Sequence, residues 1–192
     1  MATKEEAIRI TQKFISESPI YSKYKVGEDK IKEYETVWYV PFFEIIPDSD
    51  SYLVGSYNGL IVDKNTMDFM QPGSGLKLEE WIYGFKIGLR GENYDLIIKK
   101  VNDLRETKEI LPKLGMTYVK LEFENGIEWK IPQNFTRKEI NNRLKKLPCV
   151  FKNQKFTFSM DIFREIKRRN LFIYELKSSE SDPKILGELI EE

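Results

Sequence analysis

Residues 37–46 are apolar at almost every position, and no other segment of the chain has this pattern so strongly. Successive side chains of a strand point to opposite faces of a sheet, so a strand with one buried face needs only one apolar set. Here both sets are apolar: Val37, Tyr39, Phe43 and Ile45 on one face, and Trp38, Val40, Phe42 and Ile46 on the other. The pattern predicts a strand that is covered on both faces.

Two helices are predicted in the first half of the chain. Thr3 and Glu6 have the spacing of a capping box, which starts a helix over about residues 4–17. Apolar residues recur at helical spacing from Leu78 to Leu89 and predict the second helix. Both helices are amphipathic, so each is expected to pack one side against a core.

An antiparallel meander is predicted between these helices. Its further strands are expected at residues 52–55 and 59–64, followed by a short strand near Phe69. Pro41 has no N–H group to donate to a neighbouring strand, which predicts an edge position or a bulge for the strand at residues 37–46.

The clearest local signal in the second half is the pair Asn125-Gly126, which suits the two-residue turn of a hairpin. It separates two alternating strands, and their apolar residues are expected to lie on one buried face: Val119, Leu121 and Phe123 with Ile127, Trp129 and Ile131. Trp129 is therefore predicted to have a structural role.

The other elements predicted in the second half alternate between helices and strands. They are a strand at residues 94–98, a helix from Asp103 to Pro112, a helix capped by Thr136 and Glu139, a small hairpin at residues 149–158, a helix at 159–169, a strand at 171–176 and a last helix opened by Asp182 and Pro183.

The expected fold class is α+β, with mostly antiparallel strands. The chain should form a helix, an antiparallel meander of three to four strands and a helix, followed by a second, smaller α+β unit that contains the Asn-Gly hairpin. Gly91, Glu92 and Asn93 form the expected boundary, which divides the chain into domains 1–92 and 93–192.

The absence of histidine excludes many enzyme classes. Without an imidazole there is no Ser-His or Cys-His pair and no common zinc ligand set. Cys149 is the only cysteine, so an intrachain disulfide is excluded, and its apolar neighbours predict a buried, unreactive thiol. We expect no catalytic residue, no metal site and no cofactor. Because no apolar run has the length of a signal region or a membrane span, the expected location is the cytoplasm.

The first half of the chain resembles the immunity proteins of bacterial polymorphic-toxin systems, in particular the small α+β family numbered thirty-five among them. The resemblance covers residues from about 3 to 90 and is carried by three segments: Lys4-Glu5-Glu6-Ala7-Ile8, Trp38-Tyr39-Val40-Pro41-Phe42, and Tyr52 to Gly55 continuing through Leu60 to Thr66. The chain departs from the family pattern at Thr66-Met67-Asp68, where a glycine after the threonine is more usual, and in its hundred further residues. The resemblance implies a dedicated inhibitor that binds a cognate toxin.

Six residues of the first half are the predicted contacts with a protein partner: Trp38, Phe42, Asp48, Asp50, Tyr52 and Tyr57. They come from the doubly apolar strand and the loop after it. Aromatic side chains on a polar rim are typical anchors of protein interfaces. An ordinary turn at Pro47 and Asp48 is the alternative explanation for the loop.

A basic region in the second half supports a different function. Between Lys130 and Asn170 there are twelve Lys or Arg against three acidic residues. Phe151, Phe156 and Phe158 are interleaved with these charges, as in surfaces that bind phosphates and stack on bases. The basic residues considered for this nucleic-acid module are Lys145, Lys146, Arg164, Lys167, Arg168 and Arg169. Solvated helix faces, and basic residues that complement a helix C-terminus, are the alternative explanation.

The sequence therefore favours a non-enzymatic cytoplasmic protein that neutralises a toxin by stoichiometric binding. A nucleic-acid-associated module that uses residues 130–170 is the alternative. No membrane partner is expected.

Overall fold

The computed structural model describes residues 1–45, 58–90, 93–179 and 188–189. Contacts within the chain divide it into two compact units, Met1–Phe85 and Lys86–Glu192, called the first and second unit below. Both combine helices with mostly antiparallel sheets, so the predicted α+β class is confirmed. The second unit is the larger one, and the expectation of a smaller second unit is wrong. The domain boundary at residues 91–93 stays a prediction.

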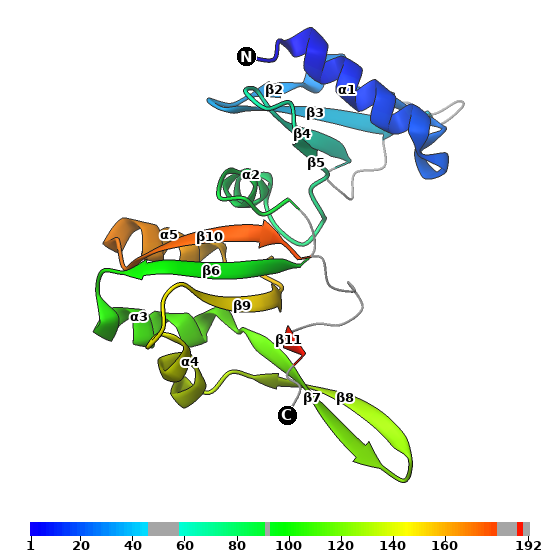
Figure 1. The fold of residues 1–192 in the computed structure, drawn as a ribbon. Coiled ribbons are helices and arrows are strands. Elements are labelled where there is room, and N and C mark those ends of the chain that lie inside the picture. Colours follow the sequence, from blue (N-terminus) through cyan, green and yellow to red (C-terminus); the bar gives the residue numbers. More distant parts are fainter. Residues whose placement is uncertain (46–57, 91–92, 180–187, 190–192) are drawn as a thin grey trace. The chain divides into compact units, whose positions relative to one another are not determined.

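The first unit is a sheet with one helix on each face (Figure 1). The sheet has the order β1-β3-β4-β5, with β2 also paired to β3, and all pairs are antiparallel. The elements are α1 (Lys4–Glu17), β1 (Tyr24–Val26), β2 (Lys32–Glu33), β3 (Val37–Glu44), β4 (Gly59–Asp63), β5 (Phe69–Met70) and α2 (Leu78–Lys86), with short 3-10 helices at Pro19–Tyr21 and Glu28–Lys30. The strand predicted at residues 52–55 lies outside the described residues.

Both faces of β3 are covered, as its pattern predicts. On one face Val40 and Phe42 pack with Ala7 and Ile15 of α1. On the other face Val37, Tyr39 and Ile61 pack with α2 through Leu78, Ile82 and Phe85. Because the two apolar sets of β3 serve two separate clusters, this strand links the two halves of the core.

Pro41 lies in the centre of the sheet, so the predicted edge position is wrong. The strand beside it is instead interrupted: β1 pairs with residues 42–44 of β3 and β2 with residues 38–39. The missing N–H of Pro41 faces this break, and its carbonyl accepts a hydrogen bond from Gly27 N at 2.9 Å. The sheet therefore accommodates a proline without losing a ladder bond.

The second unit contains two three-stranded sheets, with the orders β10-β6-β9 and β11-β7-β8. All pairs are antiparallel except the parallel pair of β11 and β7. The elements are β6 (Tyr94–Val101), α3 (Leu104–Ile110), a 3-10 helix (Leu111–Leu114), β7 (Thr117–Glu124), β8 (Ile127–Asn134), α4 (Arg137–Arg143), β9 (Cys149–Gln154), α5 (Met160–Arg169), β10 (Phe172–Ser178) and β11 (Glu188–Leu189).

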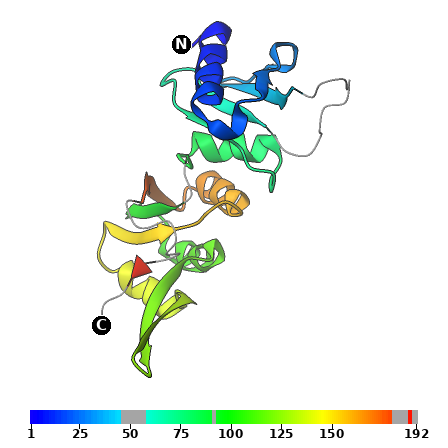
Figure 2. The same cartoon turned by 90° about the vertical axis from the view of Figure 1, so that its right-hand side faces the viewer.

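Helices α3 and α5 lie on the same side of the β10-β6-β9 sheet (Figure 2). Leu96 and Ile98 of β6 and Phe163 and Ile166 of α5 are fully buried. The alternate residues of β6 are less buried, so this sheet buries mainly one face, in contrast to β3.

Two expectations for the second half need correction. Residues 149–158 do not form a hairpin, because the segment Cys149–Gln154 is a single strand whose partner is β6. The strand ends where Asn153 adopts a left-handed conformation, with φ of 55°. The helix predicted at Asp182 and Pro183 lies outside the described residues.

We expect the two units to fold independently, because each has its own buried core. Fragments 1–90 and 86–192, which overlap at residues 86–90, should each show a cooperative transition in urea. The full chain provides the reference. If neither fragment unfolds cooperatively, the chain is one integrated domain.

We expect Phe42→Ala to destabilise the first unit by about 3–5 kcal/mol, the usual cost of truncating a buried phenylalanine. Phe42 is fully buried and lies among the rings of Phe14, Tyr21 and Tyr24, with centroids 5.1–6.1 Å away. The same substitution at Phe158, which is 78% exposed, is the matched control and should change stability by about 0.5 kcal/mol or less. Urea unfolding of both variants tests this, and equal losses would contradict it.

Candidate partner-binding surfaces

The predicted partner contacts on β3 are held within the first unit. Trp38 is half-buried, and its indole N–H donates to the carbonyl of Ala2 at 3.0 Å. The ammonium group of Lys64 lies 4.8 Å from the centroid of the Trp38 ring. Phe42 is fully buried and is part of the core between the sheet and α1. Asp48, Asp50, Tyr52 and Tyr57 lie outside the described residues.

The double apolar pattern of β3 has a structural explanation. It exceeds the need of one sheet face because α2 covers the second face. The pattern alone therefore gives no evidence of surface left for a partner. A role of Trp38 and Phe42 in partner binding stays a prediction.

One end of this sheet does expose apolar side chains. Ile45, directly after β3, is 51% exposed, and Ile20 in the first 3-10 helix is 78% exposed. The N–H of Ile45 donates to the carbonyl of Lys23 at 2.7 Å, which places both segments at the same end of the sheet. The chain returns to this end at Asn58, whose carbonyl accepts from Phe42 N at 2.9 Å. In the sequence, the four predicted loop contacts come between Ile45 and Asn58.

The β7-β8 hairpin also exposes apolar side chains. Phe123 is 73%, Ile127 54% and Trp129 51% exposed. The prediction that Trp129 is buried is wrong. Both turn residues have positive φ, 52° at Asn125 and 77° at Gly126, as the predicted two-residue turn requires. The hairpin extends away from the rest of the second unit (Figures 1 and 2).

The turn itself explains why the buried face is missing. A two-residue turn pairs Glu124 with Ile127, so Trp129 lies opposite Glu122 and Phe123 lies opposite Glu128. Residues directly opposite one another share a face. The apolar residues of β7 and β8 therefore lie on different faces, each with charged neighbours. The sequence contains this information, because the turn length fixes the register.

The basic region is spread over several elements. Arg137, Lys138 and Arg143 lie on α4, and the last four basic residues lie on α5. These two helices are separated in both views of the second unit (Figures 1 and 2). Two of the three phenylalanines expected to stack on bases, Phe151 and Phe156, are fully buried, and only Phe158 is exposed. This removes part of the support for a base-stacking surface.

Several arginines of the region have structural partners. Arg143 donates to the carbonyl of Val150 at 2.6 Å, and its guanidinium lies 4.7 and 5.2 Å from the ring centroids of Phe135 and Phe151. Arg164 pairs with Asp161 at 2.7 Å. Lys145, Lys146, Lys167 and Arg168 are exposed.

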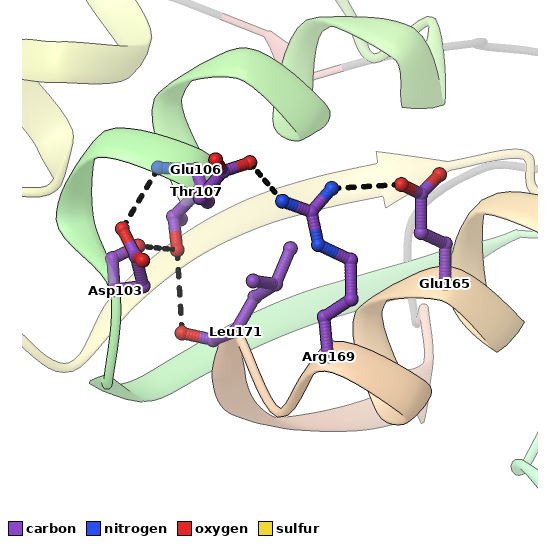
Figure 3. Close-up of polar contacts among 6 residues, drawn as sticks. All are labelled: Asp103, Glu106, Thr107, Glu165, Arg169 and Leu171. Carbon is purple, nitrogen blue, oxygen red and sulfur yellow. Dashed lines mark hydrogen bonds and ion pairs between the residues drawn. The ribbon is translucent and has the colours of Figure 1, made fainter.

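Arg169 connects two helices (Figure 3). One guanidinium nitrogen donates to Glu165 on α5 at 2.8 Å, and another donates to Glu106 on α3. The hydrogen bond from Arg169 is the main reason why the pKa of Glu165 lies below its ordinary value. Arg169, the last residue of α5, thus has side-chain partners in addition to the helix dipole.

The same junction contains a buried hydroxyl. Thr107 is fully buried, and its hydroxyl lies 2.5 Å from the carbonyl of Asp103 and 3.3 Å from that of Leu171 (Figure 3). The Asp103 side chain accepts from Glu106 N at 2.9 Å and so caps α3. The start of α3 is therefore fixed to the segment that links α5 to β10.

Cys149 is buried, as predicted, and burial raises the pKa of its thiol. A raised pKa lowers the fraction of thiolate, which is the nucleophilic form. The residues that the structure describes contain no cluster of three or more His, Cys, Asp or Glu side chains able to hold a metal ion. In that same part of the chain, no helix is long and apolar enough to cross a membrane.

No family model, curated protein or solved structure matches this chain. The resemblance to immunity proteins therefore stays a prediction, carried by the residues of the first half.

We expect Arg169→Gln to lower the urea midpoint of the second unit, because it removes the link between α3 and α5. Arg168→Gln on the same helix makes the same charge change at an exposed position and should leave the midpoint unchanged. If neither arginine has a structural role, as in the nucleic-acid alternative, the two variants should have the same urea midpoint.

The difference between the native chain and Arg169→Gln should depend on pH. The pKa of Glu165 is lower in the folded chain than in the unfolded chain. Its contribution to stability is therefore present above the unfolded pKa, about 4.3 for glutamate, and is lost as the pH falls through the folded value. The urea midpoints of the native chain and of Arg169→Gln should therefore differ at neutral pH and converge at acidic pH. A constant difference would show that this pair is not responsible.

Proposed function

We propose that this protein is a non-enzymatic cytoplasmic binding protein of the immunity type, which neutralises a toxin domain by stoichiometric occlusion. The observation that carries the proposal is the exposure of Ile20 and Ile45 at one end of the sheet of the first unit. In the sequence, Asp48, Asp50, Tyr52 and Tyr57 follow Ile45. Exposed apolar residues, tyrosines and polar rim residues are the composition expected of a protein interface.

The partner that fits such a surface is a folded protein with an apolar depression. Binding would remove the apolar surface of the two exposed isoleucines from water. The two tyrosines offer a large contact area with little loss of side-chain entropy. The carboxylates of Asp48 and Asp50 favour a partner with basic groups at the rim of that depression. Trp38 and Phe42 serve this surface by stabilising the strand that leads to it.

The experiment measures affinity for the toxin domain encoded by the neighbouring reading frame. Tyr52→Ala and Tyr57→Ala are the main variants, because a tyrosine anchor at the centre of an interface costs about 2 kcal/mol or more, roughly thirtyfold in affinity. Each variant is first shown to keep the melting temperature of the native chain. We expect at least one of the two to lose affinity by this amount.

Isoleucine substitutions provide a matched control. Ile45→Ala should weaken binding, whereas Ile173→Ala, at a position 49% exposed on β10 in the second unit, should not. If the variants at positions 48, 50, 52 and 57 bind normally while charge reversal at Lys145, Lys146 and Arg168 abolishes binding, the interface belongs to the second unit.

Salt dependence separates the proposal from the nucleic-acid alternative. Binding to phosphates releases counterions and weakens steeply with salt, whereas an interface with an apolar centre weakens much less. A titration of the native complex with sodium chloride, together with a test for binding to generic duplex and single-stranded DNA, measures this difference. Tight salt-sensitive DNA binding, with no affinity for the toxin domain, would contradict the immunity proposal.

A further inference from the structure

The two edges of the hairpin sheet of the second unit differ in how far they are covered. On the outer side of β7, the side-chain amide of Gln154 bonds both backbone groups of Thr117, each at 2.7 Å. β11 continues along this edge opposite Tyr118 and Val119. β8 pairs only with β7 among the described residues. Among the described residues, β7 is therefore covered from Thr117 to Val119, whereas β8 is uncovered along its whole length and is called the open edge below.

The hydrogen bonds of the hairpin identify the backbone groups of β8 that face outward. Phe135 N donates to the carbonyl of Met116 at 3.0 Å, so these two residues form a hydrogen-bonded pair. In antiparallel strands such pairs alternate with pairs that are not hydrogen-bonded. When this alternation is continued along the register toward the turn, Glu122 and Trp129 are also a hydrogen-bonded pair. Trp129 therefore directs its N–H and C=O groups toward β7. Glu128 and Lys130 direct theirs toward the open edge.

We propose that β8 pairs antiparallel with β8 of a second copy of this chain, centred on Trp129. In this register Glu128 lies opposite Lys130 of the second copy, and Lys130 opposite Glu128 of the second copy. All four residues present outward backbone groups, which gives four hydrogen bonds between the copies. The dimer therefore combines a short backbone ladder with two opposite-charge pairs.

The side chains of the other face are also self-complementary. In the same register Trp129 lies opposite Trp129 of the second copy, and Ile127 lies opposite Ile131 of the second copy. These three apolar residues are 54%, 51% and 36% exposed in one chain, in sequence order. The central tryptophan pair is not hydrogen-bonded, which is the pair type with the closer side chains. Association would therefore cover the exposed apolar row of β8.

Two neighbouring symmetric registers are unfavourable. Centring the pair on Glu128 places two glutamates opposite each other, and centring it on Lys130 places two lysines opposite each other. Like charges directly opposite are destabilising. A register that pairs Glu128 with Trp129 of the second copy would place backbone groups that face the open edge against groups that face β7. Pro132, which has no N–H for the open edge, ends the ladder beyond Lys130.

The test is sedimentation equilibrium of the full chain without any partner, from low micromolar to millimolar concentration, because a small interface gives a weak dimer. The native chain should show a reversible monomer–dimer equilibrium. Glu128→Lys and Lys130→Glu should each weaken it by about tenfold, since each creates two like-charge contacts per dimer. The double variant Glu128→Lys with Lys130→Glu exchanges the charges and should restore dimerisation.

Two further variants sharpen the result. Lys130→Pro removes an outward N–H without touching the bonds to β7 and should abolish the dimer. Lys138→Glu makes the same charge change as Lys130→Glu at an exposed position on α4 and should have no effect. Circular dichroism confirms that each variant is folded. A native chain that stays monomeric, or single reversals that leave the dimer unchanged, would overturn the proposal.

Failure of the double variant to restore the dimer would also overturn it, because the register would then be wrong. The proposal does not rest on the immunity function. Self-association is measured on the chain alone, whereas toxin binding is tested by variants at the end of the first unit.

Discussion

Burial of both faces of β3 is the constraint on which the first unit depends. The strand contributes Phe42 to one core and Tyr39 to the other, so α1 and α2 are both held through it. A strand enclosed in this way cannot offer its faces to a partner. Contacts with other molecules must use other parts of the first unit, such as the end of the sheet where Ile20 and Ile45 are exposed. The location of the candidate surface thus follows from how the core is built.

The elements of the second unit are held together by polar contacts as well as by buried apolar side chains. Its β6 strand buries mainly one face, and the start of α3 is held by the hydroxyl of Thr107 and by the guanidinium of Arg169. A residue that a charge count assigns to a binding surface can therefore have its main partner inside the fold. Of the basic residues, Lys146, Lys167 and Arg168 are exposed, whereas Arg143 and Arg169 have partners within the fold.

Features set by neighbours in the sequence could be predicted. The capping boxes at Thr3 and Thr136 and the turn at Asn125 and Gly126 are present as expected, because each depends on a few adjacent residues. The coverage of β3 on both faces was also predictable from its alternation. The burial of Trp129 was not, because alternation within each strand does not state which residues of two strands share a face. That information lies in the length of the turn.

Long-range pairing accounts for the other differences. Nothing near Cys149 in the sequence indicates that its strand pairs with β6, more than fifty residues earlier in the chain. The break beside Pro41 likewise needs the two short strands β1 and β2, whose sequences are mostly polar. The exposed position of Ile45 depends on where the sheet ends, and the loop contacts predicted after it are outside the described residues.

The amide of Gln154 has a consequence for how far any assembly can grow. A sheet with two open edges can add copies without limit and form a fibre, whereas a sheet with one open edge consumes that edge in the first pairing. Gln154 and β11 occupy the outer side of β7 at residues 117–119, so at the base of the hairpin β8 is the open edge of this sheet among the described residues. The proposed pairing through β8 is two-fold and uses the same edge of both copies, and the amide of Gln154 blocks the addition of a further strand at the base of β7.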